Sequence, residues 1–280
     1  MNQALLSKTI SRGMGLVKSS FAPAKPEQQA PEDITVMLPE DVPLTLMRVP
    51  GSADAMNRCS GKGSARSDDA LRHGCPLTQD FYMGKYTITK IQWWSIMKTA
   101  PWKGLANALN APESPVVYVS WNDAQDFIAA LNDRIKVITG KSPALFRLPS
   151  EAEWQYAAQA GAKKRFYWGD DPGYTHIDKY AWYRHNAREV GNAYAHLVGL
   201  KMPNAFGLFD MCGNVWEWCD NSSPGHNDAL EGDKTESAEN SRRPLRGGSW
   251  ADIGSCCCTV RQHTAGTRLA DNGFRILLAS

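Results

Sequence analysis

Thiols are the most reactive side chains in this sequence, and three of them are consecutive. The chain contains seven cysteines, of which Cys256, Cys257 and Cys258 lie in the 21-residue stretch from Ala251 to Asp271. An odd number of cysteines in a chain of this length argues against a complete disulfide framework, so reduced thiols are expected. Adjacent cysteines can be displayed to a ligand or packed as small buried hydrophobic residues, and both interpretations stay open.

Two carboxylates form a second group of candidate ligands. Asp210 and Glu217 flank a turn that contains Gly213, Asn214 and Val215. Carboxylates and backbone carbonyls are the ligands that Ca²⁺ prefers. Asp210, Glu217 and several carbonyls of this turn could therefore hold a hard cation such as Ca²⁺. The alternative is that Glu217 caps the loop by accepting backbone N–H bonds.

The other cysteines and the histidines do not have the sequence spacing of a metal-binding motif. Cys212 and Cys219 are separated by a distance that matches no known metal pattern, so we expect them to pack beneath Trp216. The six histidines are scattered along the chain, at His73, His176, His185, His196, His226 and His263. We predict no histidine-based metal site.

Two helices with clear boundaries are expected to frame these residues. Ser120 and Asp123 resemble a capping box at the start of a helix from Trp121 to about Ile135. Ser150 and Glu153 repeat that pattern before a second helix, and Gly161 occupies the position of a C-terminal glycine. A shorter helix is predicted through Trp93, Trp94 and Met97.

Strands are predicted at both ends of the folded part. Phe81–Thr89 is aromatic and β-branched, which is typical of a strand. The Gly-rich segment Arg246–Trp250 and a closing strand, Gly273–Leu278, enclose the stretch Ala251–Asp271. Because that stretch is rich in small residues and lacks helical periodicity, we expect a displayed loop whose side chains can vary.

Composition limits the functional classes. Lys and Arg number 31 against 29 Asp and Glu, a net charge of +2, so nucleic acid is not an expected partner. The sequence has no apolar run long enough to span a membrane, no recognisable signal peptide and no lipid-acceptor cysteine, and the localisation stays open.

Residues 1–34 are interpreted as a flexible tail and linker, and residues 35–280 as one domain. No pattern encodes the oligomeric state.

Five sequence blocks resemble the formylglycine-generating-enzyme (sulfatase-modifying factor) superfamily. In chain order they are Phe146–Trp154, Asn204–Asp210, Gly213–Trp218, Leu245–Trp250 and Gly273–Arg275. The resemblance implies an α+β fold of the C-type-lectin-like kind, with short strands, two main helices and much irregular structure. It also implies structural calcium held by Asp210, Glu217 and the carbonyls of Gly213 and Val215. Since one fold can host unrelated functions, the site must decide the activity.

The enzymes of this superfamily bind copper(I) through two cysteines that follow the Gly-Gly-Ser segment. By that resemblance the two positions fall on Asp252 and Cys257, so one of the two thiolates is missing. Cys256 or Cys258 could replace it, but adjacent residues point in different directions, and copper(I) prefers a defined thiolate geometry. A copper-dependent formylglycine-generating or peptide-tailoring oxidase is therefore the alternative function.

A subset of the superfamily fits better, namely the variable proteins of diversity-generating retroelements. These resemble the enzymes in scaffold, and their C-terminal loop binds ligands after template adenines, often in AAC codons, are randomised. Changing the first two bases of AAC cannot give Lys, Glu, Gln, Met or Trp, which together make up 54 of the 280 residues. A 21-residue window should hold about four of them, whereas Ala251–Asp271 holds only Gln262.

We therefore expect a non-enzymatic, receptor-like protein that binds a variable protein or surface target and needs no cofactor. The predicted ligand contacts are Ala251, Asp252, Ile253, Ser255, Cys256, Cys257, Arg261, His263, Thr264, Leu269, Ala270 and Asp271. The residues predicted to form the frame are Trp250, Cys258, Arg268, Asn272 and Phe274. A side chain on a stiff backbone loses little freedom on binding, which suits this arrangement.

Overall fold

The structure is a computed structural model of the 280-residue chain. It describes residues 33–52, 77–139, 146–220, 241–255 and 259–279. These residues belong to one unit, Pro31–Ser280. The predicted tail lies almost wholly outside the described residues, as do Cys256, Cys257 and Cys258 and most of the polar stretch before residue 77.

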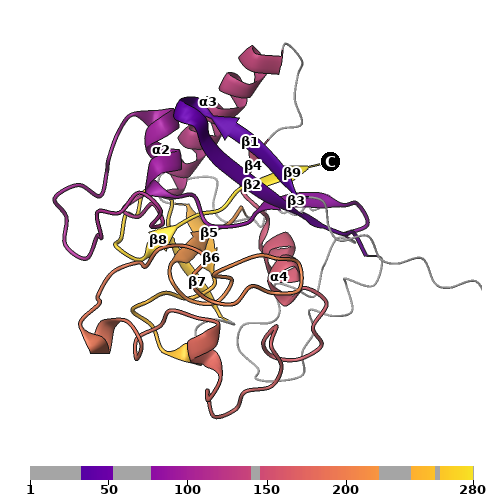
Figure 1. Ribbon diagram of the computed structural model, residues 1–280, viewed down its shortest axis with the longest axis vertical. Coiled ribbons are helices and arrows are strands. Elements are labelled where there is room, and N and C mark those ends of the chain that lie inside the picture. Colours follow the sequence, from indigo (N-terminus) through magenta and orange to yellow (C-terminus); the bar gives the residue numbers. More distant parts are fainter. Residues whose placement is uncertain (1–32, 53–76, 140–145, 221–240, 256–258, 280) are drawn as a thin grey trace, which may run out of the picture. The chain divides into compact units, whose positions relative to one another are not determined.

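A five-stranded antiparallel sheet contains both the first and the last strands of this unit. Its spatial order is β1 (Ile34–Leu38), β2 (Val42–Val49), β3 (Phe81–Gly84), β9 (Leu277–Ala279) and β4 (Phe146–Arg147). The last strand, β9, thus pairs with β3 on one side and β4 on the other. Figure 1 shows β9 beside the indigo strands from the beginning of the fold.

A smaller four-stranded sheet carries the segment predicted to bind ligands. Its spatial order is β7 (Val260–Thr264), β6 (Arg242–Arg246), β5 (Trp216–Trp218) and β8 (Asn272–Gly273). Strands β5 and β8 are parallel, whereas the other pairs are antiparallel. Strand β7 therefore lies at the edge of this sheet.

The described residues form three α-helices, which pack around the sheets: α2 (Lys90–Met97), α3 (Trp121–Thr139) and α4 (Glu151–Gln159). Both predicted capping boxes are confirmed. Asp123 N–H donates to Ser120 Oγ at 3.1 Å, and Ser150 N–H donates to Glu153 Oε2 at 2.8 Å. Helix α4 ends with left-handed backbone at Ala160 and Gly161.

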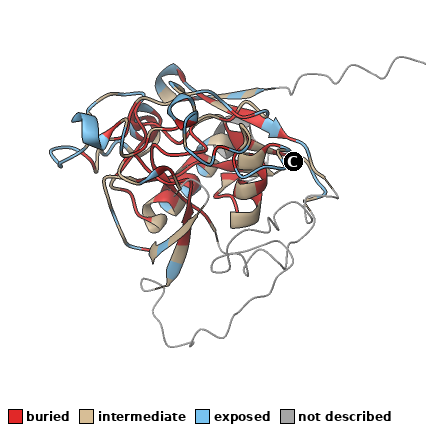
Figure 2. Ribbon diagram, turned by 90° about the horizontal axis from the view of Figure 1, so that it is seen from below, coloured by how far each residue is buried: buried red, intermediate tan, exposed pale blue. Residues whose placement is uncertain are grey.

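Aromatic rings join the helices to the connection between the sheets. Trp93 on α2 stacks on Phe127 of α3 with 5.5 Å between ring centroids, and Phe274 meets Phe127 edge-on at 5.6 Å. Offset and edge-to-face arrangements of this kind stabilise a core beyond the burial of apolar area. Figure 2 shows the buried residues concentrated where these elements pack.

Two strand predictions are wrong in their extent. The strand predicted over Phe81–Thr89 ends at Gly84, and Thr89 is instead the N-cap of α2. The predicted closing strand, Gly273–Leu278, is interrupted at residues 274–276, which leave one sheet and enter the other. There the carbonyls of Phe274 and Ile276 accept hydrogen bonds from Ile88 and Gly84, outside either ladder.

The fold class is α+β, as predicted from the resemblance. Short 3₁₀ helices, η1 (Pro39–Asp41), η3 (Ile177–Lys179) and η4 (Arg188–Val190), complete the described elements. Residues 160–215 contain two of these and are otherwise irregular. Among the described residues, no helix has the length and apolarity needed to cross a membrane.

Candidate ligand-binding site

The stretch Ala251–Asp271 is not a single loop, because strand β7 lies inside it. Residues 260–264 pair antiparallel with β6, from Val260 opposite Arg246 to Thr264 opposite Arg242. The prediction of an uninterrupted loop is therefore wrong for these five residues. The strand escaped detection because its polar interior, Arg-Gln-His, lacks the alternation of apolar and polar residues that marks a half-buried strand.

Two glycines lead from β6 into this stretch. Gly247 has φ +101° and Gly248 has φ +76°, values that L side chains rarely adopt. A Cβ at position 247 would also lie 3.2 Å from the indole of Trp154. The two residues after this turn, Ser249 and Trp250, are buried and contact Asp252 and Ala270 of the stretch, respectively.

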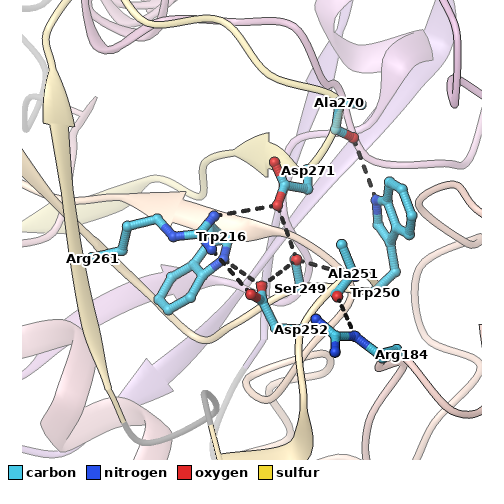
Figure 3. Close-up of polar contacts among 9 residues, drawn as sticks. All are labelled: Arg184, Trp216, Ser249, Trp250, Ala251, Asp252, Arg261, Ala270 and Asp271. Carbon is cyan, nitrogen blue, oxygen red and sulfur yellow. Dashed lines mark hydrogen bonds and ion pairs between the residues drawn. The ribbon is translucent and has the colours of Figure 1, made fainter. Parts of the chain in front are cut away.

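Asp252 is the centre of a hydrogen-bond network under the stretch (Figure 3). Its Oδ2 accepts from Trp216 Nε1 at 2.7 Å and from Ser249 Oγ at 2.5 Å. Its Oδ1 accepts from Arg261 Nη2 at 3.0 Å. Only 14% of the Asp252 side chain is exposed, so its carboxylate is used within the protein.

Arg261 connects the two ends of the stretch. Its Nη1 lies 3.3 Å from Asp271 Oδ2, and its guanidinium stacks over the ring of Trp216 at 4.5 Å. Burial raises the pKa of the Asp271 carboxyl, and the charge of Arg261 opposes that rise. Asp252, Arg261 and Asp271, all predicted ligand contacts, are thus also partners of one another.

Two further contacts hold the backbone of the stretch. Arg184 donates from its backbone N–H to Asp252 O at 2.8 Å and from Nε to Ala251 O at 3.1 Å. Arg268 forms a two-pronged ion pair with Asp123 at the start of α3, with distances of 2.6 and 2.7 Å. No local pattern marked Arg184, because it lies in irregular structure far along the chain from residue 251.

Other residues of the stretch face solvent. The side chain of Ile253 is 47% exposed, and Thr264 is exposed on β7. His263 is partly buried beside Trp218, and burial lowers its pKa. Ala251, Ser255, Leu269 and Ala270 are half-buried, whereas the predicted frame residues Trp250, Asn272 and Phe274 are buried. Cys256, Cys257 and the frame residue Cys258 lie outside the described residues.

The carboxylate of Glu217 does not fit the predicted role of a calcium ligand. Arg275 donates to it from Nε at 2.6 Å and Nη2 at 2.7 Å, and Trp154 Nε1 donates at 2.6 Å. These donors are side chains, so the alternative of a backbone cap is also wrong. In the described parts of the chain, no group of three or more His, Cys, Asp or Glu residues could hold a metal ion.

The other residues of the predicted calcium site are buried. Asp210 Oδ2 accepts from Gly199 N–H at 2.8 Å, and burial raises the pKa of Asp210 to about 6. Gly213 donates its N–H to Gly247 O at 2.8 Å, and Val215 is 1% exposed. Asp210 and Glu217 therefore accept from different donors, and Asp210 Oδ1 is buried without a hydrogen-bond partner among the described residues. Calcium at this segment stays a prediction.

Cys212 and Cys219 are buried and not joined in a disulfide, and each packs in a different core cluster from Trp216. Burial raises the pKa of the Cys219 thiol well above its ordinary value. A thiol with a raised pKa is a weak nucleophile and a weak metal ligand at neutral pH. Cys219 thus has the properties of a structural residue.

Comparison with protein families gives a match that covers most of the chain. Residues 44–280 match the sulfatase-modifying factor enzyme 1-like domain. A protein of Thermomonospora curvata named formylglycine-generating enzyme is 31% identical over 244 residues, which cover 76% of this chain and 75% of the relative. The enzyme of that name from Streptomyces coelicolor is 32% identical over 200 residues, or 65% of this chain. The chain spans 60% of the length of that second relative.

Solved structures show the same fold at lower sequence identity. The Treponema denticola variable protein 1 matches with a TM-score of 0.64 and 24% identity, over 89% of this chain and 99% of that chain. PvdO from Pseudomonas aeruginosa matches with a TM-score of 0.58 and 23% identity, over 89% of this chain and 92% of that chain. Identities this low support the shared fold and leave the activity to the site.

Proposed function

This chain belongs to the family of sulfatase-modifying factor enzyme 1-like domains, and within that family we propose that it is a ligand-binding protein without enzymatic activity. Its binding surface comprises the displayed side chains of Ala251–Asp271. Like a receptor, it binds a target through this surface. The target is a protein or a surface ligand, and it differs between variants of the stretch. The relatives of similar sequence are named formylglycine-generating enzymes, and that activity is stated for those relatives and not for this chain.

The environment of Asp252 carries the proposal. By the resemblance to the family's enzymes, position 252 corresponds to one of the two copper-binding thiolates. Here its carboxylate accepts hydrogen bonds from Trp216, Ser249 and Arg261. A hard, internally paired oxygen ligand is poorly suited to copper(I), which prefers soft thiolates. The residue holds the loop in place instead.

The same network supports a division between frame and display. Asp252, Arg261 and Asp271 fix the backbone by contacts to each other, while Ile253 and Thr264 face solvent from the same stretch. A pre-organised backbone loses little entropy on binding, and exposed side chains can change without disturbing a core. We accordingly narrow the proposed contacts to the displayed residues, and assign Asp252, Arg261 and Asp271 to their support.

We further propose that these displayed positions vary between copies of the gene by retroelement mutagenesis. The likeness in fold to the Treponema denticola variable protein 1 supports this, as does the depletion of Lys, Glu, Gln, Met and Trp between residues 251 and 271. The experiment is to sequence the 3′ end of the gene and the downstream region in sibling isolates. Substitutions confined to codons 251–271 that match adenines in a nearby near-copy are expected. An invariant stretch with no near-copy would refute the diversification.

A copper-dependent oxidase is the second candidate, because relatives at 31–32% identity are named formylglycine-generating enzymes. Copper(I) titration of the reduced protein, followed by an assay for oxidation of a cysteine-containing peptide, separates the two functions. We expect no peptide oxidation. The variant Asp252→Cys places a thiol at the position where the family's enzymes have one. It is the positive control, and we expect it to bind copper(I) more tightly than the natural protein. Copper-dependent turnover by the natural protein would establish the oxidase.

A further inference from the structure

Strand β7 is an open edge of the smaller sheet and lies inside the stretch Ala251–Asp271. Among the described strands it pairs only with β6. In an antiparallel pair, the main-chain groups of successive residues face alternately toward the partner strand and away from it. Half of the residues of β7 therefore direct their N–H and C=O groups out of the sheet.

The orientation of β6 identifies these residues. Cys219 N–H donates to Pro244 O at 2.9 Å, so the main-chain groups of Pro244 face β5. Those of the next residue, Leu245, consequently face β7. Leu245 lies opposite Arg261, and the main-chain groups of Arg261 therefore bond to β6.

The main-chain groups of Val260, Gln262 and Thr264 accordingly point away from β6. In agreement with this alternation, Ala265 N–H donates across the pair to Ser241 O at 3.0 Å. Within the described part of the chain, both main-chain groups of Val260 and Gln262 and the N–H of Thr264 have no hydrogen-bond partner. Gln262 and Thr264 are also exposed.

A different strand edge of the same protein is covered. On β4, Asn132 of α3 donates to Phe146 O and accepts from Phe146 N–H, each at 2.9 Å. Natural proteins also protect edge strands with proline, lysine or a bulge. Strand β7 has no proline or lysine, its register with β6 is continuous, and its Arg261 is engaged over the ring of Trp216 (Figure 3). This edge is therefore suited to pairing with another strand.

The spacing of these groups indicates the chemistry of the partner. Donors and acceptors that alternate along an extended strand are matched by the main chain of another extended segment. Such bonds do not depend on side chains, so every variant of a diversified stretch would keep them. Gln262, at the centre of β7, is the one residue of the stretch whose type cannot arise from an AAC codon by changes in its first two bases.

We propose that β7 binds an extended segment of the target protein, which pairs with Val260–Thr264 as an additional strand of the smaller sheet. The inference rests on the proposed ligand-binding function and deepens it. The main chain of β7 provides affinity common to all variants, and the displayed side chains on either side provide specificity.

Linear peptides from a random library displayed on phage, selected against the full chain, are the probes. Gln262→Pro removes an outward N–H and leaves the bonds to β6 in place, because proline is tolerated where the N–H of an edge strand faces solvent. Gln262→Ala is the matched control, since it removes the side chain and keeps the N–H. We expect the affinity of the selected peptides to fall at least about tenfold in Gln262→Pro and to change less than about threefold in Gln262→Ala.

A second measurement changes the peptide and leaves the protein intact. N-methylation of one peptide residue at a time removes its N–H, and in a paired strand only every second N–H faces β7. Binding should weaken about tenfold at alternate positions and less than about threefold at the positions between them. Losses without this alternation, or equal affinity for Gln262→Pro and Gln262→Ala, overturn the proposal.

Ile253→Ser separates the paired edge from the proposed function. If the affinity of the peptides depends on Ile253 but not on the proline at position 262, the ligand-binding surface stands and the paired edge is wrong. If the library yields no peptide that binds the chain, the paired edge is wrong as well, and the sequences of sibling isolates still test the diversification.

Discussion

At the scale of single residues, the buried pair of Arg275 and Glu217 is the most consequential contact. Both side chains are 0% exposed. Arg275 also donates from Nη1 to Gly84 O and from Nη2 to Phe209 O, each at 3.0 Å. One guanidinium therefore joins β5, the end of β3 and the irregular segment before residue 210.

Removing one member of this pair leaves a buried charge uncompensated. We predict that Arg275→Met lowers the free energy of unfolding by about 3–5 kcal/mol, measured by urea denaturation. Glu40→Gln is the control, because Glu40 and Lys98 form a pair whose side chains are 58% and 51% exposed. That change is expected to cost about 0–1 kcal/mol. A similar cost for both variants would contradict the structural role of Arg275.

His196 gives a prediction about acid stability. It stacks on Trp182 with 3.8 Å between ring centroids, and burial, followed by the charge of Lys201, lowers its pKa to about 4 from 6.5. Between these two values the unfolded chain binds more protons, so stability is full above pH 6.5 and decreases as the pH falls towards 4. His196→Phe keeps the stacked ring but cannot be protonated. It should therefore reduce the acid-dependent loss in the free energy of unfolding by about 2 kcal/mol.

Urea denaturation at pH 7 and pH 4.5 measures that effect. His185→Phe is the control, because the His185 side chain is 60% exposed. The control variant should follow the pH profile of the natural protein. If His196→Phe follows that profile too, His196 is not buried in its neutral form.

The sequence identified individual residues unevenly. Arg275 belongs to a recognised sequence block, but that block predicted neither its bonds to backbone carbonyls nor its ion pair with Glu217. A pair separated by 58 positions leaves no local pattern, since charge pairs can be read from sequence only within one helix or strand. Ser249, between Asp252 and Asp271, was missed for the same reason.

At the scale of elements, helix α3 shows what local sequence can determine. Ser120 Oγ donates to Asp123 Oδ2 at 2.7 Å, and the same carboxylate binds Arg268. The N-terminus of α3 is therefore tied to the end of the candidate binding stretch. The cap was predicted because its residues are three positions apart, whereas the link to Arg268 spans 145 positions.

We predict that Ser120→Ala destabilises the protein by about 1 kcal/mol, the usual effect of losing an N-cap. Asp126, exposed in the second turn of α3, provides the control. Asp126→Asn should change stability by less than about 0.5 kcal/mol. Thermal unfolding monitored by circular dichroism compares the two, and an N-cap variant as stable as the control would exclude the capping role.

The neighbouring residues Asp252 and Ile253 test the division between frame and display. Asp252→Ala leaves three donors without their acceptor and should cost about 2–4 kcal/mol. Ile253 is 47% exposed, so Ile253→Ser should cost less than about 1 kcal/mol. Chemical denaturation of both variants gives the comparison. Equal costs would mean that the stretch is not divided in this way.

At the scale of the whole described unit, the order of strands along the chain differs from their order in space. The last strand, β9, lies between β3 and β4, and Leu277 is fully buried. The sequence predicted a closing strand but not its neighbours. Pairing between strands nearly 200 positions apart depends on loop closure and shared packing, which no short window of sequence contains.

Replacing Leu277–Ala279 with Gly-Ser-Gly should abolish cooperative unfolding, because it removes an interior strand of the five-stranded sheet, the one between β3 and β4, and its buried leucine. Differential scanning calorimetry measures the transition. Leu269→Ser, at a half-buried position before β8, is the control and should retain one transition. A sharp transition in the β9 variant would show that the sheet is stable without it.

The position of β9 between β3 and β4 also determines which genetic changes the protein can survive. The proposed diversified stretch is translated before β9, so an insertion or deletion that shifts its codons also rewrites residues 277–279. Such a chain lacks the strand that joins β3 to β4, and is expected to be degraded rather than displayed. Folding would thereby act as a reading-frame filter on the repertoire: point substitutions reach the surface and frameshifted copies do not.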